Sequence, residues 1–449
     1  MVRVLRWLIA ISRGRGNAAS MARVLALRSL AIGVNVLTGL LTAAVLGPAG
    51  RGEQTALTVA PHFLAGLATL GLHASFIYNV KADPQHEREY LGANLVMLCL
   101  AGILVSAVGW VVLPCWLTQY SPDAIALARM FLCTAPFTCM TWTLLAAAEA
   151  RGLFNFANTT LYLQSLATLA MLLVLARLHL LTPATAGASY VMVPIPAFLY
   201  FAWHIGRMVR PPLRLRPPFP RRLLHYGLRF YGVDLLATLS GYLDQIIIVA
   251  LLAPGLVGIY SVALSTARML TVLQMAVGSV LFPSVAARST AVIVERVAAT
   301  LRVTSLVTAL AALAMGLAGP YLLMLLYGPR FALAVAPFQV LLLDTLVASS
   351  ARILYLAFSG SGRPEWVTGF EVAGVIVSVA AMLVLVPRFG LTGAAFAVLL
   401  ASSVRLACGI AGLRLVMKSE MPRLLLSWSD VKAGLRALGM TAAVEDAAP

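Results

Sequence analysis

The sequence has few charged residues: 11% of its 449 residues are charged, whereas 61% are hydrophobic. A soluble domain carries about 25% charged residues, so this shortage excludes one large soluble core and indicates a polytopic membrane protein. Acidic side chains are the scarcer sign, with 16 of them against 33 lysines and arginines. The formal net charge of +17 raises the question of a nucleic-acid partner.

The placement of the basic residues argues against nucleic acid. They cluster between apolar segments, as they do in loops that border membrane spans. A nucleic-acid interface combines a basic face with stacking aromatic residues, and none are interleaved with these clusters. We therefore expect no nucleic-acid partner.

Signals for metal binding and catalysis are also missing. The five cysteines include no CxxC pair, have no histidine at ligand spacing, and lie in or beside apolar segments, which is typical of small core residues. No glycine-rich nucleotide-binding loop precedes Lys-Ser or Lys-Thr. We predict no catalytic residue, metal site or cofactor, and if the chain transports a substrate, coupling to H⁺ or Na⁺ stays open.

Long apolar runs predict an all-α membrane protein with about twelve transmembrane helices. A bilayer core of about 30 Å needs about 20 apolar residues per helix. Internal prolines predict kinks at Pro61, Pro136, Pro194, Pro196 and Pro337. The predicted spans are 25–47, 56–80, 91–117, 124–148, 159–180, 187–208, 227–252, 257–285, 297–326, 334–359, 367–386 and 392–417.

The basic residues also predict how the chain is oriented. They gather before the first span, between the sixth and seventh spans, and in the C-terminal tail. Because basic loops stay in the cytoplasm, both termini and the central loop are expected there. The loops on the other side carry at most one basic residue each, namely Arg51, Arg177, Arg330 and Arg388.

The central loop divides the predicted spans six and six. Its sequence at 210–222, RPPLRLRPPFPRR, is typical of a stiff interdomain linker, which we favour over a docking site for a partner or for anionic headgroups. The predicted organisation is a basic cytoplasmic segment 1–24, an N-lobe 25–208, a linker 209–226, a C-lobe 227–417 and a cytoplasmic tail 418–449.

The two halves resemble each other at three places with a nearly constant offset. Six spans per half would give equivalent helices the same direction, so the repeat predicts two parallel lobes related by a pseudo-twofold axis along the membrane normal. Repeats of this kind commonly bind substrate between the lobes and work by alternating access. The matching segments are 44–52 with 250–258, 147–152 with 357–362, and 170–180 with 381–391.

Several of these segments resemble polysaccharide exporters of the multidrug/oligosaccharidyl-lipid/polysaccharide (MOP) flippase superfamily. The resemblance covers roughly residues 25–415 and depends on the order and spacing of short apolar motifs. The motifs are LTAAVLGPAGRGEQTAL (41–57), LDQIIIVALLAPGLVGIYSVALS (243–265), LFPSVA (281–286), AFSGSGRPEW (357–366) and FGLTGAAFA (389–397).

This resemblance implies a flippase in the bacterial inner membrane. Its expected substrate is an oligosaccharide repeat unit linked to undecaprenyl diphosphate, destined for O-antigen, capsule or exopolysaccharide. The expected partners are this polyprenyl-diphosphate-linked oligosaccharide, membrane lipids, and the glycosyltransferases and polymerase of the same pathway.

Two other functions stay open. A drug/cation antiporter of the same fold (MATE type) would favour acidic residues inside the N-lobe, where Glu149 is the nearest carboxylate. An integral-membrane polymerase would need a large external loop with catalytic acids, whereas every predicted external loop is short.

Ionisable residues inside the spans are candidate site residues, because such residues normally face a cavity or a partner. Asp244 and Arg268 lie at similar depths in the seventh and eighth spans, so they are expected to pair or to line the substrate cavity with Ser265. Asp344 and Arg352 share the tenth span, where Arg352 either borders the cavity or reaches the interface. Arg405 needs a partner that the sequence does not identify.

Polar residues of the first two spans complete the set of candidates. Asn35 and Thr38, with Thr42, form a polar face that either contacts sugar or joins helices. His62 and His73 are eleven residues apart and would share a face of a continuous helix. They and Asp234 are candidates for proton coupling, although interior histidines are more often structural.

Overall fold

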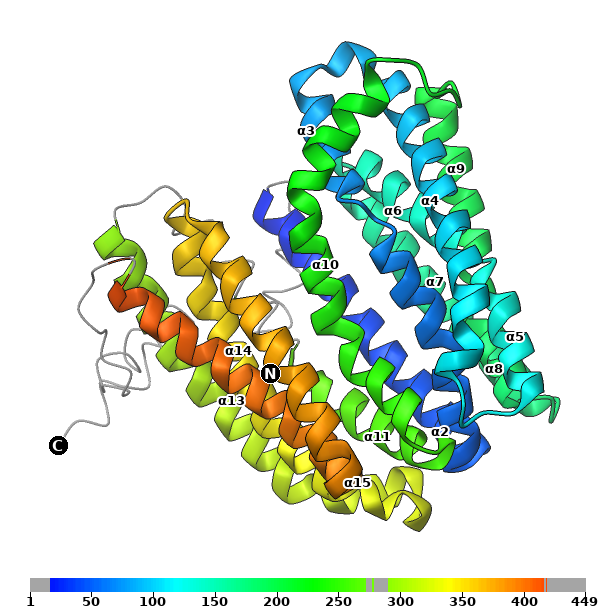
Figure 1. Cartoon of the computed structure of the whole chain (residues 1–449), viewed down its shortest axis with the longest axis vertical. Coiled ribbons are helices and arrows are strands. Elements are labelled where there is room, and N and C mark those ends of the chain that lie inside the picture. The colour runs from blue at the N-terminus through cyan, green and yellow to red at the C-terminus, as the bar shows by residue number, and fades with distance from the viewer. Residues whose placement is uncertain (1–16, 272–276, 278–289, 416, 418–449) are drawn as a thin grey trace. The chain divides into compact units, whose positions relative to one another are not determined.

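The computed structural model describes residues 17–271, 277, 290–415 and 417. Within these residues every regular element is an α-helix or a 3₁₀ helix, and there is no β-strand (Figure 1). Nine of the described helical segments are long and apolar enough to cross a membrane. The predicted all-α, multi-pass membrane fold is confirmed, and the count of twelve spans is consistent with it.

The described α-helices follow one another along the chain with short connections. They are α2 (Asn17–Leu67), α3 (Leu72–Ala82), α4 (Glu87–Trp116), α5 (Pro122–Leu132), α6 (Ala135–Ala150), α7 (Phe154–Arg177), α8 (Pro183–Met192), α9 (Pro194–Val209), α10 (Phe219–Leu251), α11 (Pro254–Ala267), α13 (Thr290–Tyr327), α14 (Val335–Gly360) and α15 (Pro364–Leu415). Short 3₁₀ helices are η1 (Pro84–His86), η2 (Arg268–Leu270) and η3 (Pro329–Ala334).

Helix α2 contains the first predicted span and the first half of the second, and α15 contains nearly all of the last two. With 51 and 52 residues, each is far longer than one crossing requires. Gly47 and Gly390 leave the helical conformation, with φ of 66° and 56°, a region that glycine enters without steric cost. Each glycine lies in the predicted connection between two spans or at its edge, so the chain bends there.

Two predicted spans are interrupted at prolines. The fourth span divides into α5 and α6 because the ring of Pro136 clashes with the carbonyl of Leu132, the last residue of α5. The sixth divides into α8 and α9 at Pro194 and Pro196. The predicted eighth span, 257–285, is helical through α11 and η2; residues 272–276 and 278–285 lie outside the described residues.

The second predicted span, 56–80, is interrupted at residues 68–71. Leu70 and Gly71 have φ of 49° and 66°, and α3 begins at Leu72. Gly71 is required here because a side chain would overlap the carbonyl oxygen of Gly227 on α10. The helix break therefore coincides with a close approach between two backbones. The uninterrupted apolar run of the sequence gives no sign of this break.

The described chain forms two compact units. Unit 1 contains residues 1–265 and 324–334, and unit 2 contains residues 266–323 and 335–449. The predicted lobe boundaries around 209–226 stay a prediction, and the two units are described separately.

The core of unit 1 is built from α2, α3, α4, α6 and α9. Large side chains in it are fully buried, including Phe76, Tyr90 and Phe201. Helix α10 joins the same unit: the Ser75 hydroxyl donates to the Leu223 carbonyl (2.7 Å), and the Tyr231 hydroxyl donates to the Leu67 carbonyl (2.8 Å). The predicted seventh span thus packs against the second.

Unit 2 is a cluster of α13, α14 and α15. Its core contains Ile293, Leu354 and Phe358, all buried. The hydroxyls of Ser305 on α13 and Ser350 on α14 lie 3.0 Å apart, and such polar contacts join membrane helices.

The repeat-related turns of unit 1 contact each other reciprocally. A side chain at Gly52 would overlap the carbonyl oxygen of Pro254, and one at Gly258 would overlap the carbonyl oxygen of Pro48. Pro48 and Gly52 match Pro254 and Gly258 in the sequence repeat. A contact in which residue i meets j and j meets i is the signature of a twofold relation, so these turns lie about a local pseudo-twofold axis.

We predict that Gly52→Ala destabilises the protein, because the added methyl group has no space between the two turns. Forced overpacking costs about 1–3 kcal/mol, which lowers the midpoint of thermal unfolding in detergent. Gly255→Ala is the matched control, because nothing lies within 4 Å of the added atom. Equal unfolding midpoints for the two variants would contradict the close approach of the turns.

Candidate functional site

Arg51 is a cation of unit 1 whose side chain is held in place by two hydrogen bonds. It lies four residues after the bend at Gly47, is half-buried, and its Nη1 donates to the Thr42 hydroxyl (2.8 Å) and to the buried side-chain oxygen of Gln54. We expected Arg51 in a loop outside the membrane; the structure places it in a helix instead, and the side of the membrane on which it lies stays a prediction. The helix resumes directly after Gly47, so Arg51 folds back against the preceding turn of α2.

The predicted polar face of the first span leads to this arginine. The Thr38 hydroxyl donates to the Asn35 carbonyl (2.7 Å), and the Thr42 hydroxyl donates to the Thr38 carbonyl (2.8 Å). Thr38 and Thr42 are buried, whereas Asn35 is exposed. The oxygen of Thr42 remains available to accept the hydrogen bond from Arg51, so this face holds the guanidinium in place.

The charge of Arg51 is not neutralised within unit 1. Among the residues that the structure describes, no carboxylate forms a salt bridge with it, and its buried Nε has no hydrogen-bond partner. A guanidinium binds phosphate or carboxylate through two parallel N–H groups. The arrangement therefore suits an anionic ligand.

A second polar cluster joins α3 to α10. His73 Nδ1 lies 3.4 Å from Asp234 Oδ2, and the Asp234 side chain is 14% exposed. The pair follows directly after the helix break at residues 68–71, and non-helical backbone at membrane depth occurs where it is buried in protein or lines a cavity. A histidine–carboxylate pair in such a place can take up and release a proton.

The sequence predicts that His62 and His73 share one face of a helix, but the structure gives His62 a different partner. Its Nδ1 lies 2.8 Å from the Thr58 carbonyl oxygen, one turn earlier on α2. The face that His62 and His73 would share presupposes a continuous helix, and the break at residues 68–71 separates them.

The residues expected around the seventh and eighth spans fall in different surroundings. Asp244 is buried on α10. The Ser265 hydroxyl donates to the Val262 carbonyl (3.1 Å), and Arg268, which opens η2, is exposed. Asp244 belongs to unit 1 and Arg268 to unit 2, so their pairing stays a prediction.

In unit 2 the structure supplies the partner that Arg405 requires. Arg405 Nε lies 3.1 Å from Glu371 Oε2, and both side chains are largely buried. Gly374 makes room, because a side chain there would overlap that of Arg405. On α14, Asp344 is half-buried and Arg352 is exposed.

Comparison with known proteins places these features in a family. Residues 22–289 match the family model described as "Polysaccharide biosynthesis protein". The chain has no significant sequence match among curated proteins.

Similar solved structures are membrane transporters. The lipid II flippase MurJ in an inward closed conformation is 11% identical, with a TM-score of 0.72 over 93% of this chain and 92% of that one. An inward-facing multidrug resistance MATE family transporter of the MOP superfamily is 13% identical, with a TM-score of 0.69 over 86% and 94%. A MOP superfamily transporter from Pyrococcus furiosus is 12% identical, with a TM-score of 0.61 over 89% and 96%. These likenesses show the fold.

The ion pair of α15 gives a testable coupling. We predict that Glu371→Gln and Arg405→Gln each lower stability by about 1–3 kcal/mol, because each removes one charge of a largely buried ion pair. The double variant should lose less stability than the sum of the losses of the two single variants. Thermal unfolding of the four proteins in detergent measures the coupling, and strictly additive losses would show that the pair contributes nothing.

Proposed function

The chain belongs to the polysaccharide biosynthesis protein family, and from that premise we propose that it flips a lipid-linked oligosaccharide across the bacterial inner membrane. The substrate is a repeat unit carried on undecaprenyl diphosphate, and the product serves the assembly of O-antigen, capsule or exopolysaccharide. The protein acts as a transporter by alternating access, with both termini in the cytoplasm. Glycosyltransferases supply its substrate and a polymerase consumes its product.

The observation that carries the proposal is the unneutralised guanidinium of Arg51. A diphosphate has to cross the hydrocarbon layer without contacting it, which requires a cation in a polar passage. Arg51 presents a buried, unpartnered Nε beside an Nη1 held by Thr42 and Gln54. A rigid fork of this kind fits phosphate oxygens better than a flexible ammonium does.

The same observation weighs against a drug/cation antiporter. A cationic drug needs an anionic site, whereas Arg51 places a half-buried positive charge on α2, with no salt bridge among the described residues, two residues before the half-buried Glu53. Arg51 would repel such a substrate and attract a diphosphate.

Energy for the movement is proposed to come from an ion gradient or from downstream use of the product. The His73–Asp234 pair is the candidate for H⁺ coupling, because it joins α3 to α10 beside an interrupted helix. Na⁺ is the alternative ion. Asp244, Asp344, Ser265, Arg268 and Arg352 stay candidates for contact with the oligosaccharide.

We predict that Arg51→Ala lowers export of surface polysaccharide by about 10- to 100-fold, the equivalent of losing hydrogen bonds to a charged group. Arg51→Lys should restore part of it, because the charge returns without the planar fork. Export is measured in cells that carry the variant as their only copy of this gene, at equal amounts of membrane-inserted protein.

Arg177→Gln is the matched control, because Arg177 is an exposed arginine at the end of α7. Full export by a well-expressed, folded Arg51→Ala protein would remove Arg51 from the substrate path. Unchanged polysaccharide together with altered drug sensitivity would favour the antiporter.

A further inference from the structure

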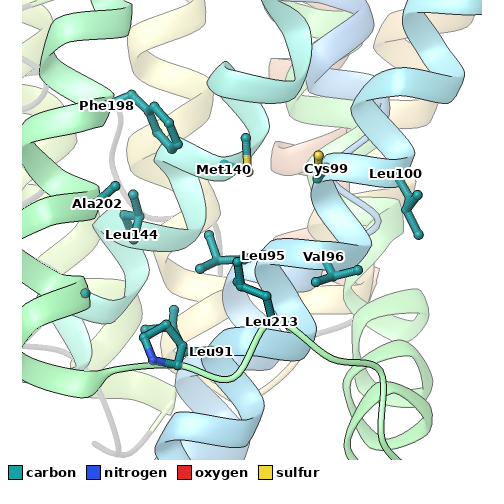
Figure 2. A pocket seen from close by; sticks show the side chains of 12 residues that line it. Leu91, Leu95, Val96, Cys99, Leu100, Met140, Leu144, Phe198, Ala202 and Leu213 are labelled. Carbon is teal, nitrogen blue, oxygen red and sulfur yellow. The ribbon is translucent and has the colours of Figure 1, made fainter.

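An apolar cavity lies inside unit 1, away from Arg51 in the fold. It has a volume of about 380 Å³ and lies between α4, α6 and α9. Figure 2 shows side chains of the three helices pointing into it. Its walls include Leu95, Cys99, Met140, Leu144, Phe198 and Ala202.

The arginine- and proline-rich linker closes one end of this cavity. Pro211 and Leu213 are part of its lining, and Figure 2 shows the linker passing beside Leu91. Two contacts fix the linker there: Arg88 donates to the Arg210 carbonyl from Nη2 (3.1 Å) and Nε (3.3 Å), and Gly92 leaves space for the Pro212 carbonyl oxygen. The linker is therefore part of the site and not only a spacer.

The cavity is open at its side. Leu100 and Leu213 line it, yet they are 54% and 66% exposed. Leu100 lies within Pro84–Trp116, a segment long and apolar enough to cross a membrane, so we infer that the opening at α4 faces hydrocarbon. Water does not fill an apolar space without polar partners, whereas a hydrocarbon chain does.

The volume is suited to one acyl chain. It corresponds to roughly a dozen water molecules at about 30 Å³ each, and a methylene group takes up a similar space. An undecaprenyl chain is several times larger. The occupant that fits is therefore the chain of an ordinary membrane lipid and not the carrier of the proposed substrate.

Positive charge surrounds the linker end of the cavity. Arg207, Arg210 and Arg214 are exposed, and no described carboxylate forms a salt bridge with them. The guanidinium of Arg207 lies over the Trp203 ring (4.8 Å), an aromatic–basic combination typical of the lipid headgroup level.

Two acids near the start of α4 are already occupied, and Glu89 forms no salt bridge among the described residues. Glu87 accepts two hydrogen bonds of 2.7 Å from Arg151, and Asp83 contacts His86 (2.8 Å) and Arg222 (3.5 Å). The arginines of the linker end therefore keep their charge available for a headgroup.

We propose that this cavity binds one acyl chain of an anionic glycerophospholipid, whose phosphate is held by Arg207, Arg210 and Arg214. The site is distinct from the proposed substrate path and does not depend on it. Bound lipid would fix the linker against α4 and α9. It would also stabilise the protein, because a ligand that binds only the folded state stabilises that state.

The test uses the purified full-length protein in nanodiscs that contain phosphatidylglycerol with a photoreactive group at the end of one acyl chain. We expect labelled peptides from residues 91–100 and 198–206. Gly206→Leu should abolish this labelling, because Gly206 lines the cavity and nothing lies within 4 Å of the added atom, so the new side chain has open space to occupy.

Gly369→Leu is the control, because Gly369 on α15 is exposed, lies outside the cavity, and likewise has nothing within 4 Å of its added atom. It should leave the labelling unchanged. Thermal unfolding checks that both variants fold, and Ala202→Phe, which also fills the cavity, replaces Gly206→Leu if that variant does not.

A second arm tests the headgroup. An arginine near an anionic lipid contributes about fivefold in affinity, so Arg207→Gln and Arg214→Gln should each lower labelling by phosphatidylglycerol about that much. Labelling by the matching phosphatidylcholine probe should not change.

Three results would overturn the proposal. Labelling that survives Gly206→Leu and Ala202→Phe would place the lipid elsewhere. Labels spread evenly over lipid-facing helices would indicate annular lipid only. Stronger competition by a polyprenyl phosphate than by phosphatidylglycerol would show that the occupant is the carrier lipid.

Discussion

The contact on which unit 1 depends is the approach of two repeat-related turns. Gly52 meets the Pro254 carbonyl and Gly258 meets the Pro48 carbonyl, at a separation that excludes any side chain. This contact brings the hairpin formed by the halves of α2 against the one formed by α10 and α11. The bend at Gly47 is part of the same turn, and it places Arg51 against Thr42. Packing of the hairpins thus positions the cation of the proposed substrate path.

Much of this fold could be predicted from the sequence, because a long apolar run indicates a membrane helix. The repeat identified both turns before their contact was seen, and Pro136 and Pro194 predicted breaks that the structure contains. Other features have no such signal. The break at residues 68–71 interrupts an evenly apolar run, at a place where Gly71 closely approaches Gly227 on another helix. The partnership of Arg405 with Glu371 depends on how two spans turn toward each other.

Arg51 illustrates why site residues were harder to predict than helices. A single arginine between two spans is typical of a loop, and the rule that assigns basic loops does not distinguish a loop from a bend made by one glycine. The signal was present in the polar face of Thr38 and Thr42, which points toward the end of the span. The contact between the linker and a cavity could not be predicted for a similar reason. The prolines and arginines of the linker predict stiffness and charge, whereas the cavity forms only when α4, α6 and α9 pack together.

The measurement that tests the central claim most directly is the sidedness of the lipid-linked oligosaccharide in inner-membrane vesicles from cells depleted of this protein. We predict that complete repeat units accumulate on the cytoplasmic leaflet while surface polysaccharide disappears, and that restoring the wild-type chain reverses both changes. Accumulation of single units on the opposite leaflet would contradict the account, because translocation would then proceed without the protein and a polymerase or ligase would be the missing activity.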